Sequence, residues 1–573
     1  MYQPRQRKEH PWRVRIIAIA VVAFSAVLVA RLYYLQIVHA DSFKQSADRQ
    51  YTNPSQRVFS RGTIYFTRRD GSPFSAATLK RGYKLTINPS LISDPEHAYI
   101  AINSIYPLDR DIFMSKAAIK NDPYEEVAKK IDEDIAKEID ALDLDGVRII
   151  IEQWRSYPAN SLAAQVVGFL GYRGDDFVGQ YGIERGYEDT LSRGTQNVYA
   201  NFFAEVFSYI NKAVTYAAPD EGDIVTTLEP NVQMYLEGQL QKVQDSYKSV
   251  RTGGIIINPQ TGEIYAMGAV PSFDPNTYYN VQDDGVFRNP LIHDVYELGS
   301  IVKPLTVAAG LDAGVITPDS TYYDAGSVTL NGRTIYNYDK RARGQVAVQE
   351  ILNQSLNTGV THIMLQLGTK KFADYFSAYG LTESTGIDLP GEATNLTNNL
   401  SSRETVNYAT AAFGQGIAVT PMSLVRALSA LANGGEVITP HVVKQITYTS
   451  GKTKTPVYDP VRRAISQETS MEISKMLTQV VDKALLGGQI KFEHYSVAAK
   501  TGTAQIAKPG GGYYDDRFLH SFFGYFPSYD PQFLVFMYTV EPKGEEYASA
   551  TLTHPFQSIA QFLINYYEVP PDR

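Results

Sequence analysis

The sequence predicts an α+β protein in which helices pack against an antiparallel sheet, preceded by a single membrane-spanning helix. Three observations carry this prediction. An uncharged apolar run near the N-terminus is long enough to cross a bilayer. Apolar segments at 253–258 and 263–270 flank a Pro-Gln-Thr-Gly turn, which is typical of a β-hairpin. A helical pattern at 300–311 then separates this hairpin from a strand at 533–540 and a closing helix at 554–567, an order that favours a helix-covered antiparallel sheet.

Composition places the chain among folded proteins of several domains. Its 573 residues predict roughly two to four domains. Hydrophobic residues make up 44% and charged residues 20%, which is ordinary for a globular chain. The formal net charge of −8 argues against a nucleic-acid partner, because such domains carry a basic excess. The absence of cysteine excludes disulfides, a thiol nucleophile, an iron–sulfur cluster and a cysteine-ligated zinc.

Residues 16–38 form the predicted membrane anchor. Residues 16–30 carry no charge, and after Arg31 the apolar run continues to Val38 with only Gln36 polar. Before the span, five cations and one acid predict that residues 1–15 are a basic cytoplasmic tail and that the rest of the chain is exported. The alternative is a signal peptide that is cleaved after Ala40.

Two further segments organise the exported part. Residues 121–146 read as one amphipathic helix with a solvated charged face, because apolar side chains recur every three or four residues. They are Val127, Ile131, Ile135, Ile139 and Leu142. The Ala-Ala-Pro-Asp-Glu-Gly-Asp stretch at 217–223 is typical of a turn or linker and marks a domain boundary.

The first of three short chemical motifs contains Ser300 and Lys303. If Ser300 opens a helix, residues three apart share a face, so the amine can reach the hydroxyl. A serine needs such a base, and a lysine can be one if burial or positive charge lowers its pKa. The free Ser300 N–H at the helix start could also bind an oxyanion. Alone the motif is weak, since about one or two such pairs are expected by chance in a chain of this length.

The second motif contains Ser355 and Asn357. From a tight loop, two side chains at this spacing can point the same way. The hydroxyl could relay a proton, and the amide could position a substrate carbonyl or the lysine amine. Such pairs are common in turns, so this motif decides nothing alone.

The third motif is Lys500-Thr501-Gly502-Thr503, on a predicted strand. Alternation places Lys500 and Gly502 on one face and the two threonines on the other. Gly502 would let a substrate backbone approach closely. Lys500 and a threonine hydroxyl could hold a carboxylate, and the Thr503 N–H could supply a second oxyanion donor.

The three motifs in this order are the set that penicillin-binding proteins and class A β-lactamases carry. Other stretches make the chain similar to the class B penicillin-binding proteins, the single-span, monofunctional peptidoglycan D,D-transpeptidases of division or elongation. The resemblance covers most of the chain. Its stretches are RLYYLQI at 31–37, RGTI at 61–64, RSYP at 155–158, VGFLG at 167–171, GIERGYE at 182–188, TTL at 226–228, TGEI at 261–264, FGQGI at 413–417 and NGG at 433–435.

The resemblance implies a fold and an organisation. The transpeptidase domain would have the penicillin-binding-protein/β-lactamase-like fold and occupy 223–573. An elongated N-terminal pedestal of dimerisation type would occupy 39–222, after the anchor. The pedestal head at 61–71 is about two residues longer than the usual form. Leu298 stands where proline is commoner, Ala499 where glycine is usual, and residues 548–551 lack the usual glycines.

The resemblance also implies a reaction without cofactor or metal. Ser300 would attack the D-Ala-D-Ala carbonyl of a stem peptide, with Lys303 as base and with Ser355 and Asn357 assisting. Lys500, Thr501, Gly502 and Thr503 would form the site of the terminal carboxylate. An amine from a neighbouring stem peptide would resolve the acyl-enzyme, and β-lactams would acylate the same serine.

Several alternatives stay open at this point. A D,D-carboxypeptidase would use the same residues with water as acceptor, and a β-lactamase would need a deacylating carboxylate. Glu392 lies at a tempting position for that role, but residues 385–392 read as a turn. A non-catalytic scaffold of the cell-wall synthesis complex is a further alternative. The short pedestal favours a septal over an elongation role, and the implied partner is a multi-span membrane glycosyltransferase.

Overall fold

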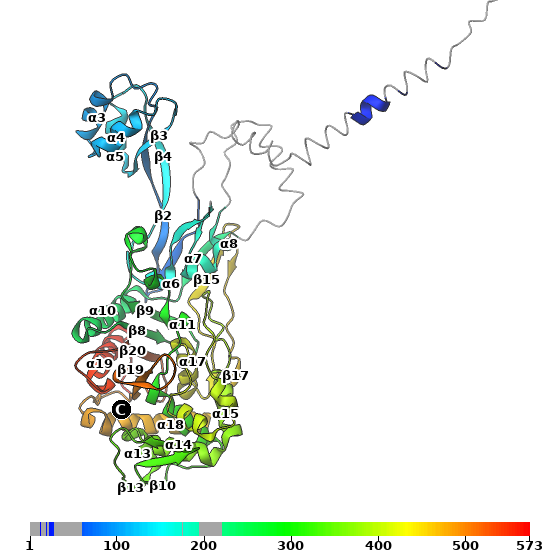
Figure 1. The fold of residues 1–573 in the computed structure, drawn as a ribbon, viewed down its shortest axis with the longest axis vertical. Helices are drawn as coiled ribbons and strands as arrows, with labels where there is room; N and C mark the ends of the chain where they lie inside the picture. Colours follow the sequence, from blue (N-terminus) through cyan, green and yellow to red (C-terminus); the bar gives the residue numbers. More distant parts are fainter. Residues whose placement is uncertain (1–11, 13–18, 20–21, 28–59, 175, 194–220) are drawn as a thin grey trace, which may run out of the picture. The chain divides into compact units, whose positions relative to one another are not determined.

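The computed structural model describes Trp12, Ile19 and residues 22–27, 60–174, 176–193 and 221–573, and it divides into two units (Figure 1). Of the described residues, 81–154 belong to the first unit, and 61–80, 155–192 and 221–573 belong to the second. The predicted tail and anchor lie almost wholly outside the described residues, as does most of the predicted linker. In the described part of the chain, no helix is long and apolar enough to span a membrane.

The first unit is a small α+β assembly with an apolar core of its own. Its part of the long strand β2 (Pro73–Ile87) pairs with β3 (Glu125–Ile131) and β4 (Val147–Ser156). Its helices are α3 (Pro95–Asn103), α4 (Arg110–Ala117) and α5 (Glu133–Asp140). The buried core includes Leu85, Ile102, Phe113, Ile131 and Ile139.

The single helix predicted over 121–146 is wrong in its first half. That half contains strand β3, and helix α5 begins only after Lys130 has adopted a positive φ of 56°. The four-residue spacing of Val127 and Ile131 fits a strand of period two as well as a helix. Pairing with β2, which places Ile131 opposite Tyr83, decides for the strand.

The second unit opens with a mixed sheet in the order β16-β15-β7-β1-β2. Strand β1 (Ile64–Thr67) runs parallel to β7 (Gly222–Thr226), and β7 pairs antiparallel with β15 (Val443–Tyr448), which is followed by β16 (Thr453–Lys454). Short elements accompany this sheet. They are α6 (Ala164–Val167), β5 (Leu170–Arg173), β6 (Asp176–Gly179), α7 (Gly182–Gly186) and α8 (Glu188–Leu191).

A buried ion cluster joins Arg61, which lies three residues before β1, to α7 and α8. The fully buried Glu184 accepts hydrogen bonds from Nε of Arg61 at 2.7 Å and from Nε of Arg155 at 2.6 Å. Arg61 also donates from both Nη atoms to Glu188, at 2.8 Å each. The hydroxyl of Tyr157 donates to Glu184 at 3.2 Å. Buried charges are tolerated only when they are paired in this way, so the cluster depends on each member.

The principal sheet of the second unit has five antiparallel strands in the order β18-β19-β20-β8-β9. They are β18 (Ala498–Ala507), β19 (Tyr513–Phe526), β20 (Phe533–Val540), β8 (Arg251–Ile257) and β9 (Ile264–Val270). The predicted hairpin and the predicted strand over 533–540 are confirmed, and so is the α+β class. Strand β18 lies at the edge of the sheet, which leaves one side of its backbone unpaired by other strands.

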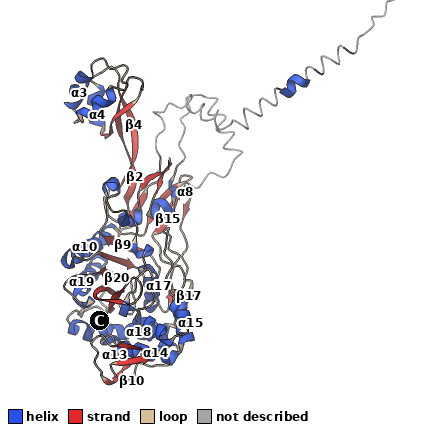
Figure 2. Ribbon diagram, in the orientation of Figure 1, coloured by secondary structure: helices blue, strands red, loops and turns tan. Residues whose placement is uncertain are grey.

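Helices cover both faces of this sheet (Figure 2). Helices α10 (Pro230–Tyr247) and α19 (Ala548–Tyr567) pack on one face, where Phe522 of β19 contacts Phe556 of α19 with ring centroids 4.5 Å apart. On the other face, the hydroxyls of Tyr525 and Ser474 are 2.8 Å apart and join β19 to α18 (Gln467–Gln479). The closing helix begins six residues before the predicted start and continues through Pro555.

The remaining elements form a mainly helical region beyond the second face. Its helices are α11 (Pro290–His293), α12 (Lys303–Asp312), α13 (Val348–Asn353), α14 (Asn357–Leu367), α15 (Thr369–Ala378), α16 (Thr405–Ala411) and α17 (Pro421–Ala432). Its short strands are β10 (Thr321–Asp324), β11 (Ser327–Leu330), β12 (Arg333–Tyr336), β13 (Gly344–Ala347), β14 (Glu436–Val437) and β17 (Arg462–Arg463). The predicted site residues lie where this region meets the edge strand β18.

Candidate active site

Ser300 lies in a 3-10 turn, η5 (Gly299–Val302), that leads directly into α12. The helix predicted from Ser300 onward is confirmed, with a first turn that is tighter than an α-helix. Pro304 lies in the first turn of α12, where its missing N–H costs no hydrogen bond. Ser300 is half-buried, so part of the residue remains exposed to solvent.

Glycines bring three backbone segments together at Ser300. A Cβ on Gly502 would lie 2.4 Å from Oγ of Ser521 and 2.8 Å from the carbonyl oxygen of Leu298. A Cβ on Gly414 would lie 2.2 Å from the carbonyl oxygen of Gly299, whose N–H donates to the Gly414 carbonyl at 3.1 Å. The close approach that we expected of a substrate backbone at Gly502 is therefore made by the chain's own segment before the serine.

Lys303 is fully buried, and its amine is hydrogen-bonded to Ser355. It donates to Oγ of Ser355 at 3.1 Å and also to the Ser355 carbonyl oxygen. Ser355 adopts a positive φ of 55°, which turns its carbonyl and its hydroxyl toward the same amine. Within the described residues, no hydrogen bond joins Ser300 to Lys303. The first and second motifs are thus brought together through Ser355.

Burial controls the protonation of the two lysines. Loss of solvent, and next the positive charge of Lys500, hold the pKa of Lys303 well below its usual value. Burial lowers the pKa of Lys500 to about 8. Neither amine forms an ion pair with a carboxylate in the part of the chain that the structure describes. A neutral amine has two N–H groups and one lone pair, and the two donations to Ser355 leave the lone pair of Lys303 available as a base.

Asn357 is the first residue of α14, and its side-chain amide donates to the carbonyl oxygen of Tyr336 at 2.9 Å. The next residue, Thr358, donates to the buried carboxylate of Asp324 at 2.8 Å, and Asn337 donates to the same carboxylate at 2.9 Å. This network holds the second motif against β10 and the loop after β12. Neither Asp324 nor Asn337 belongs to a sequence motif, because their partners are distant in the chain.

The third motif occupies β18 as the alternation predicts. The side chains of Thr501 and Thr503 lie on the face that carries α19, and Lys500 lies on the opposite face, where it is buried. The amine of Lys500 donates to the Thr501 carbonyl at 3.0 Å. The Thr503 hydroxyl accepts the backbone N–H of Ala548, the first residue of α19, at 3.1 Å.

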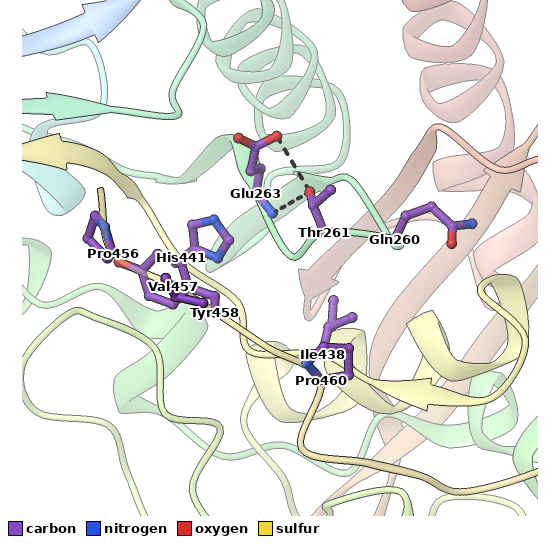
Figure 3. Close-up of a pocket in the computed structure, with 9 residues that line it drawn as sticks. All are labelled: Gln260, Thr261, Glu263, Ile438, His441, Pro456, Val457, Tyr458 and Pro460. Carbon is purple, nitrogen blue, oxygen red and sulfur yellow. Dashed lines mark hydrogen bonds between the residues drawn. The ribbon is translucent and has the colours of Figure 1, made fainter. Parts of the chain in front are cut away.

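Two other features lie apart from the residues of the three motifs. Both carboxylate oxygens of Glu392 accept the backbone N–H of Thr385, at 2.9 and 3.0 Å, as expected of a turn. An open pocket of about 380 Å³ is shown in Figure 3, and none of the eight predicted site residues lines it. Its wall includes His441 and Tyr458, whose rings stack with centroids 3.7 Å apart.

Two family models match the chain. The model described as penicillin binding protein transpeptidase domain matches residues 252–561, and the penicillin-binding protein dimerisation domain matches residues 59–204. Among curated relatives, Stage V sporulation protein D of Bacillus subtilis is 30% identical over 551 residues, which are 94% of this chain and 83% of that protein. The peptidoglycan D,D-transpeptidase FtsI homolog of Mesostigma viride is 26% identical over 97% of this chain and 96% of its own length.

Solved structures share the fold. Penicillin binding protein 2X from Streptococcus thermophilus superposes with a TM-score of 0.73 at 20% identity, over 90% of this chain and 81% of that one. Penicillin binding protein 3 of Mycobacterium tuberculosis, solved free and with aztreonam or ampicillin, gives 0.68 at 22% identity. That superposition covers 90% of this chain and 98% of the apo structure. The chain therefore belongs to the penicillin-binding protein family and is a transpeptidase of cell-wall synthesis.

Proposed function

We propose that Ser300 is the acylated nucleophile of this D-Ala-D-Ala transpeptidase and that Lys303 is its general base. One observation supports this assignment most strongly. Lys303 lies three residues after Ser300, is fully buried, has a lowered pKa and donates both of its neutral N–H groups to Ser355. In its neutral form this amine has a lone pair that can accept the proton of the Ser300 hydroxyl.

The acylation step follows from this arrangement. Lys303 takes the hydroxyl proton as Ser300 Oγ bonds to the carbonyl carbon of the penultimate D-Ala. The peptide bond to the last D-Ala breaks, and its nitrogen receives a proton through the Ser355 hydroxyl. In the second step an amine of a neighbouring stem peptide attacks the ester carbon. The ester C–Oγ bond breaks, and one amine proton returns to Ser300.

We assign the terminal carboxylate of the donor peptide to the third motif. The hydroxyls of Thr501 and Thr503 lie on one face of the edge strand and can donate to it. Lys500 supplies positive charge from the opposite face, and Gly502 holds the strand against η5. Asn357 is assigned an assisting role, in which its amide positions a substrate carbonyl or the Lys303 amine. β-Lactams, which carry an equivalent carboxylate, are the second class of ligand.

We propose a cytoplasmic tail over 1–15, an anchor over 16–38, a pedestal over 39–222 and a transpeptidase domain over 223–573. Residues 1–38 have the charge pattern of a single-pass protein whose catalytic domain is exported. The match of the dimerisation-domain model to residues 59–204 supports the pedestal assignment. A multi-span membrane glycosyltransferase that supplies nascent glycan is the proposed partner.

Septal synthesis during division is the cellular role that we favour. Relatives that cover most of the chain bear the name FtsI, including proteins of Mesostigma viride and Buchnera aphidicola. A sporulation role is the second candidate, because the relative at 30% identity is named Stage V sporulation protein D. Depletion of the protein in its host distinguishes them: loss of septa supports the first role, and normal growth with defective spores supports the second.

The other enzymatic alternatives are weaker on specific grounds. A β-lactamase role for Glu392 would require a free carboxylate, whereas both of its oxygens accept the Thr385 N–H. A purely structural role does not explain why two lysines are buried without a carboxylate partner among the described residues, since burying an amine is costly. A carboxypeptidase uses the same acyl-enzyme and differs only in taking water as the acceptor.

Labelling of the full chain with a fluorescent penicillin tests the assignment. The wild type and the control Ser377→Ala, on the remote helix α15, should give one covalent band. Ser300→Ala should give none while keeping the wild-type melting temperature. A band that persists in Ser300→Ala would identify a different nucleophile. A second assay with a D-Ala-D-Ala donor and an amine acceptor then separates cross-linked product from hydrolysed product.

A further inference from the structure

His520 is a fully buried imidazole that none of the three motifs includes. It lies on β19 directly opposite Thr503 of β18. Directly opposite residues of an antiparallel pair project from the same face of the sheet, so both side chains face α19. A buried polar side chain needs partners, and those of His520 show what it holds in place.

Both ring nitrogens of His520 are hydrogen-bonded to the start of α19. Nε2 lies 3.0 Å from the carbonyl oxygen of Glu546, and Nδ1 lies 2.9 Å from the hydroxyl of Thr551. A carbonyl oxygen can only accept, so Nε2 carries the ring proton and Nδ1 accepts from Thr551. Burial lowers the pKa of His520 to about 4, so this neutral tautomer persists at neutral pH.

These two partners bracket the residue that touches the third motif. Glu546 precedes α19, Thr551 lies in its first turn, and Ala548 between them donates its N–H to Oγ of Thr503. The first turn of α19 is thus fixed to β19 by His520 and to β18 by Thr503. Thr551 belongs to the stretch at 548–551 in which the expected glycines are absent, so this chain has a side chain available for the contact.

The contact determines how the Thr503 hydroxyl can act. A hydroxyl has one proton and two lone pairs, and the Ala548 N–H occupies a lone pair. The proton must then point elsewhere, and accepting one hydrogen bond strengthens the bond that the hydroxyl donates. A carboxylate can only accept hydrogen bonds, so a hydroxyl held as a donor is what it requires.

We propose that His520 is a positioning residue for the carboxylate site: it fixes the first turn of α19 so that the Ala548 N–H keeps the Thr503 hydroxyl oriented as a donor. This inference rests on the proposed role of Thr503 in binding the substrate carboxylate. It adds a residue that does not touch substrate and that acts through Thr551, Glu546 and Ala548.

The test compares two probes on the full chain. Benzylpenicillin has the carboxylate, and its methyl ester lacks it. We expect His520→Phe to lower the second-order acylation rate constant for benzylpenicillin by at least about tenfold and to lower that for the ester by much less. Thr551→Val removes one of the two contacts of His520. It should also slow acylation by benzylpenicillin more than acylation by the ester, but by a smaller factor than His520→Phe does. Thr551→Ser keeps the hydroxyl and should restore the wild-type ratio of the rate constants for benzylpenicillin and the ester.

Controls keep the outcome decisive. Thr503→Val gives the ratio of the two acylation rate constants that is expected when the hydroxyl itself is lost. Thermal melting identifies variants that fail to fold, and Thr551→Val with Thr551→Ser decides the question if His520→Phe is one of them. An unchanged ratio in folded variants, or an equal loss for both probes, overturns the proposal. If the wild type is not acylated by either probe, the proposed function itself has failed, which is a distinguishable result.

Discussion

Lys303 and Ser355 are joined by two hydrogen bonds, because the buried amine donates to both the hydroxyl and the carbonyl oxygen of one serine. This double contact depends on the left-handed backbone of Ser355. It fixes the direction of the remaining lone pair of the neutral amine, which is the property that a general base needs.

Replacing Ser355 separates its hydroxyl from its backbone. We expect Ser355→Ala to lower the rate of acylation by benzylpenicillin by about 10²- to 10⁴-fold, the usual contribution of a proton-transfer group. Ser355→Gly should lose the same activity but be more stable than Ser355→Ala by about 1 kcal/mol, since glycine adopts positive φ without strain. Stopped-flow acylation and chemical denaturation measure the two effects. Equal stability of both variants would argue against strain at this residue.

The two buried lysines predict a bell-shaped pH dependence of acylation. The rate should rise as Lys303 loses its proton and fall near pH 8 as Lys500 loses its own. The positive charge of Lys500 lowers the pKa of Lys303, so Lys500→Met should move the rising limb to higher pH and abolish the falling limb. A pH profile of acylation from 5 to about 10 measures both. A rising limb that stays in place would show that the two amines are not coupled.

The lowered pKa of Lys500 also makes the free energy of unfolding depend on pH. Between about pH 8 and 10.5, Lys500 binds a proton in the unfolded chain but not in the folded one. Stability rises with pH wherever the unfolded state binds more protons. The free energy of unfolding of the wild type should therefore increase over this range relative to that of Lys500→Met, as measured by denaturation at each pH.

The next prediction concerns Gly502, where β18 lies tightly against the segment that contains Ser300. A methyl group there would meet Ser521, Leu298 and the N–H of Ile301 within 3.0 Å. We expect Gly502→Ala to destabilise the protein by about 1–3 kcal/mol and to abolish penicillin labelling, because β18 must move away from η5. The control is Gly238→Ala in α10, where a Cβ meets nothing within 4 Å, and it should stabilise by up to about 1 kcal/mol. Labelling that survives in Gly502→Ala would show that the strand can shift without harm to the site.

We expect a conservative substitution in the ion cluster around Arg61 to lower the free energy of unfolding strongly. Glu184→Gln leaves two buried guanidinium groups without their shared carboxylate, and we expect a loss of about 3–5 kcal/mol in the free energy of unfolding. Glu188→Gln, at a partly exposed partner, is the matched control and should cost less. Denaturation of both variants checks the order. Equal costs would mean that burial of Glu184 does not set the energy of the cluster.

The sequence predicted the elements that carry the three motifs better than it predicted their contacts. The helix that follows Ser300 and the strand that contains Lys500 are confirmed, because helix and strand periodicity act over short distances. The hydrogen bond of Lys303 to Ser355 was not anticipated, since it depends on a positive φ that serine rarely adopts. His520 could not be identified, because its importance comes from a register between β18 and β19 that one sequence does not display.

In the fold, too, local patterns are predictable from the sequence and long-range pairing is not. The hairpin at β8 and β9 and the strand β20 are local patterns and are confirmed. The prediction of one helix over 121–146 is wrong in its first half, because the apolar spacing there fits a helix and a strand equally. The strand forms because it pairs with β2.

The glycine contacts around Ser300 also restrict how the enzyme can escape inhibition. A Cβ would lie 2.2 Å from a backbone oxygen at Gly414, 2.8 Å from one at Gly502 and 3.0 Å from one at Gly299, where φ is also positive. A substitution at any of them would disturb the backbone around Ser300. If Ser300 is the acylated serine, as we propose, we expect variants that tolerate β-lactams to carry their changes at exposed positions such as Tyr338 rather than at these three glycines.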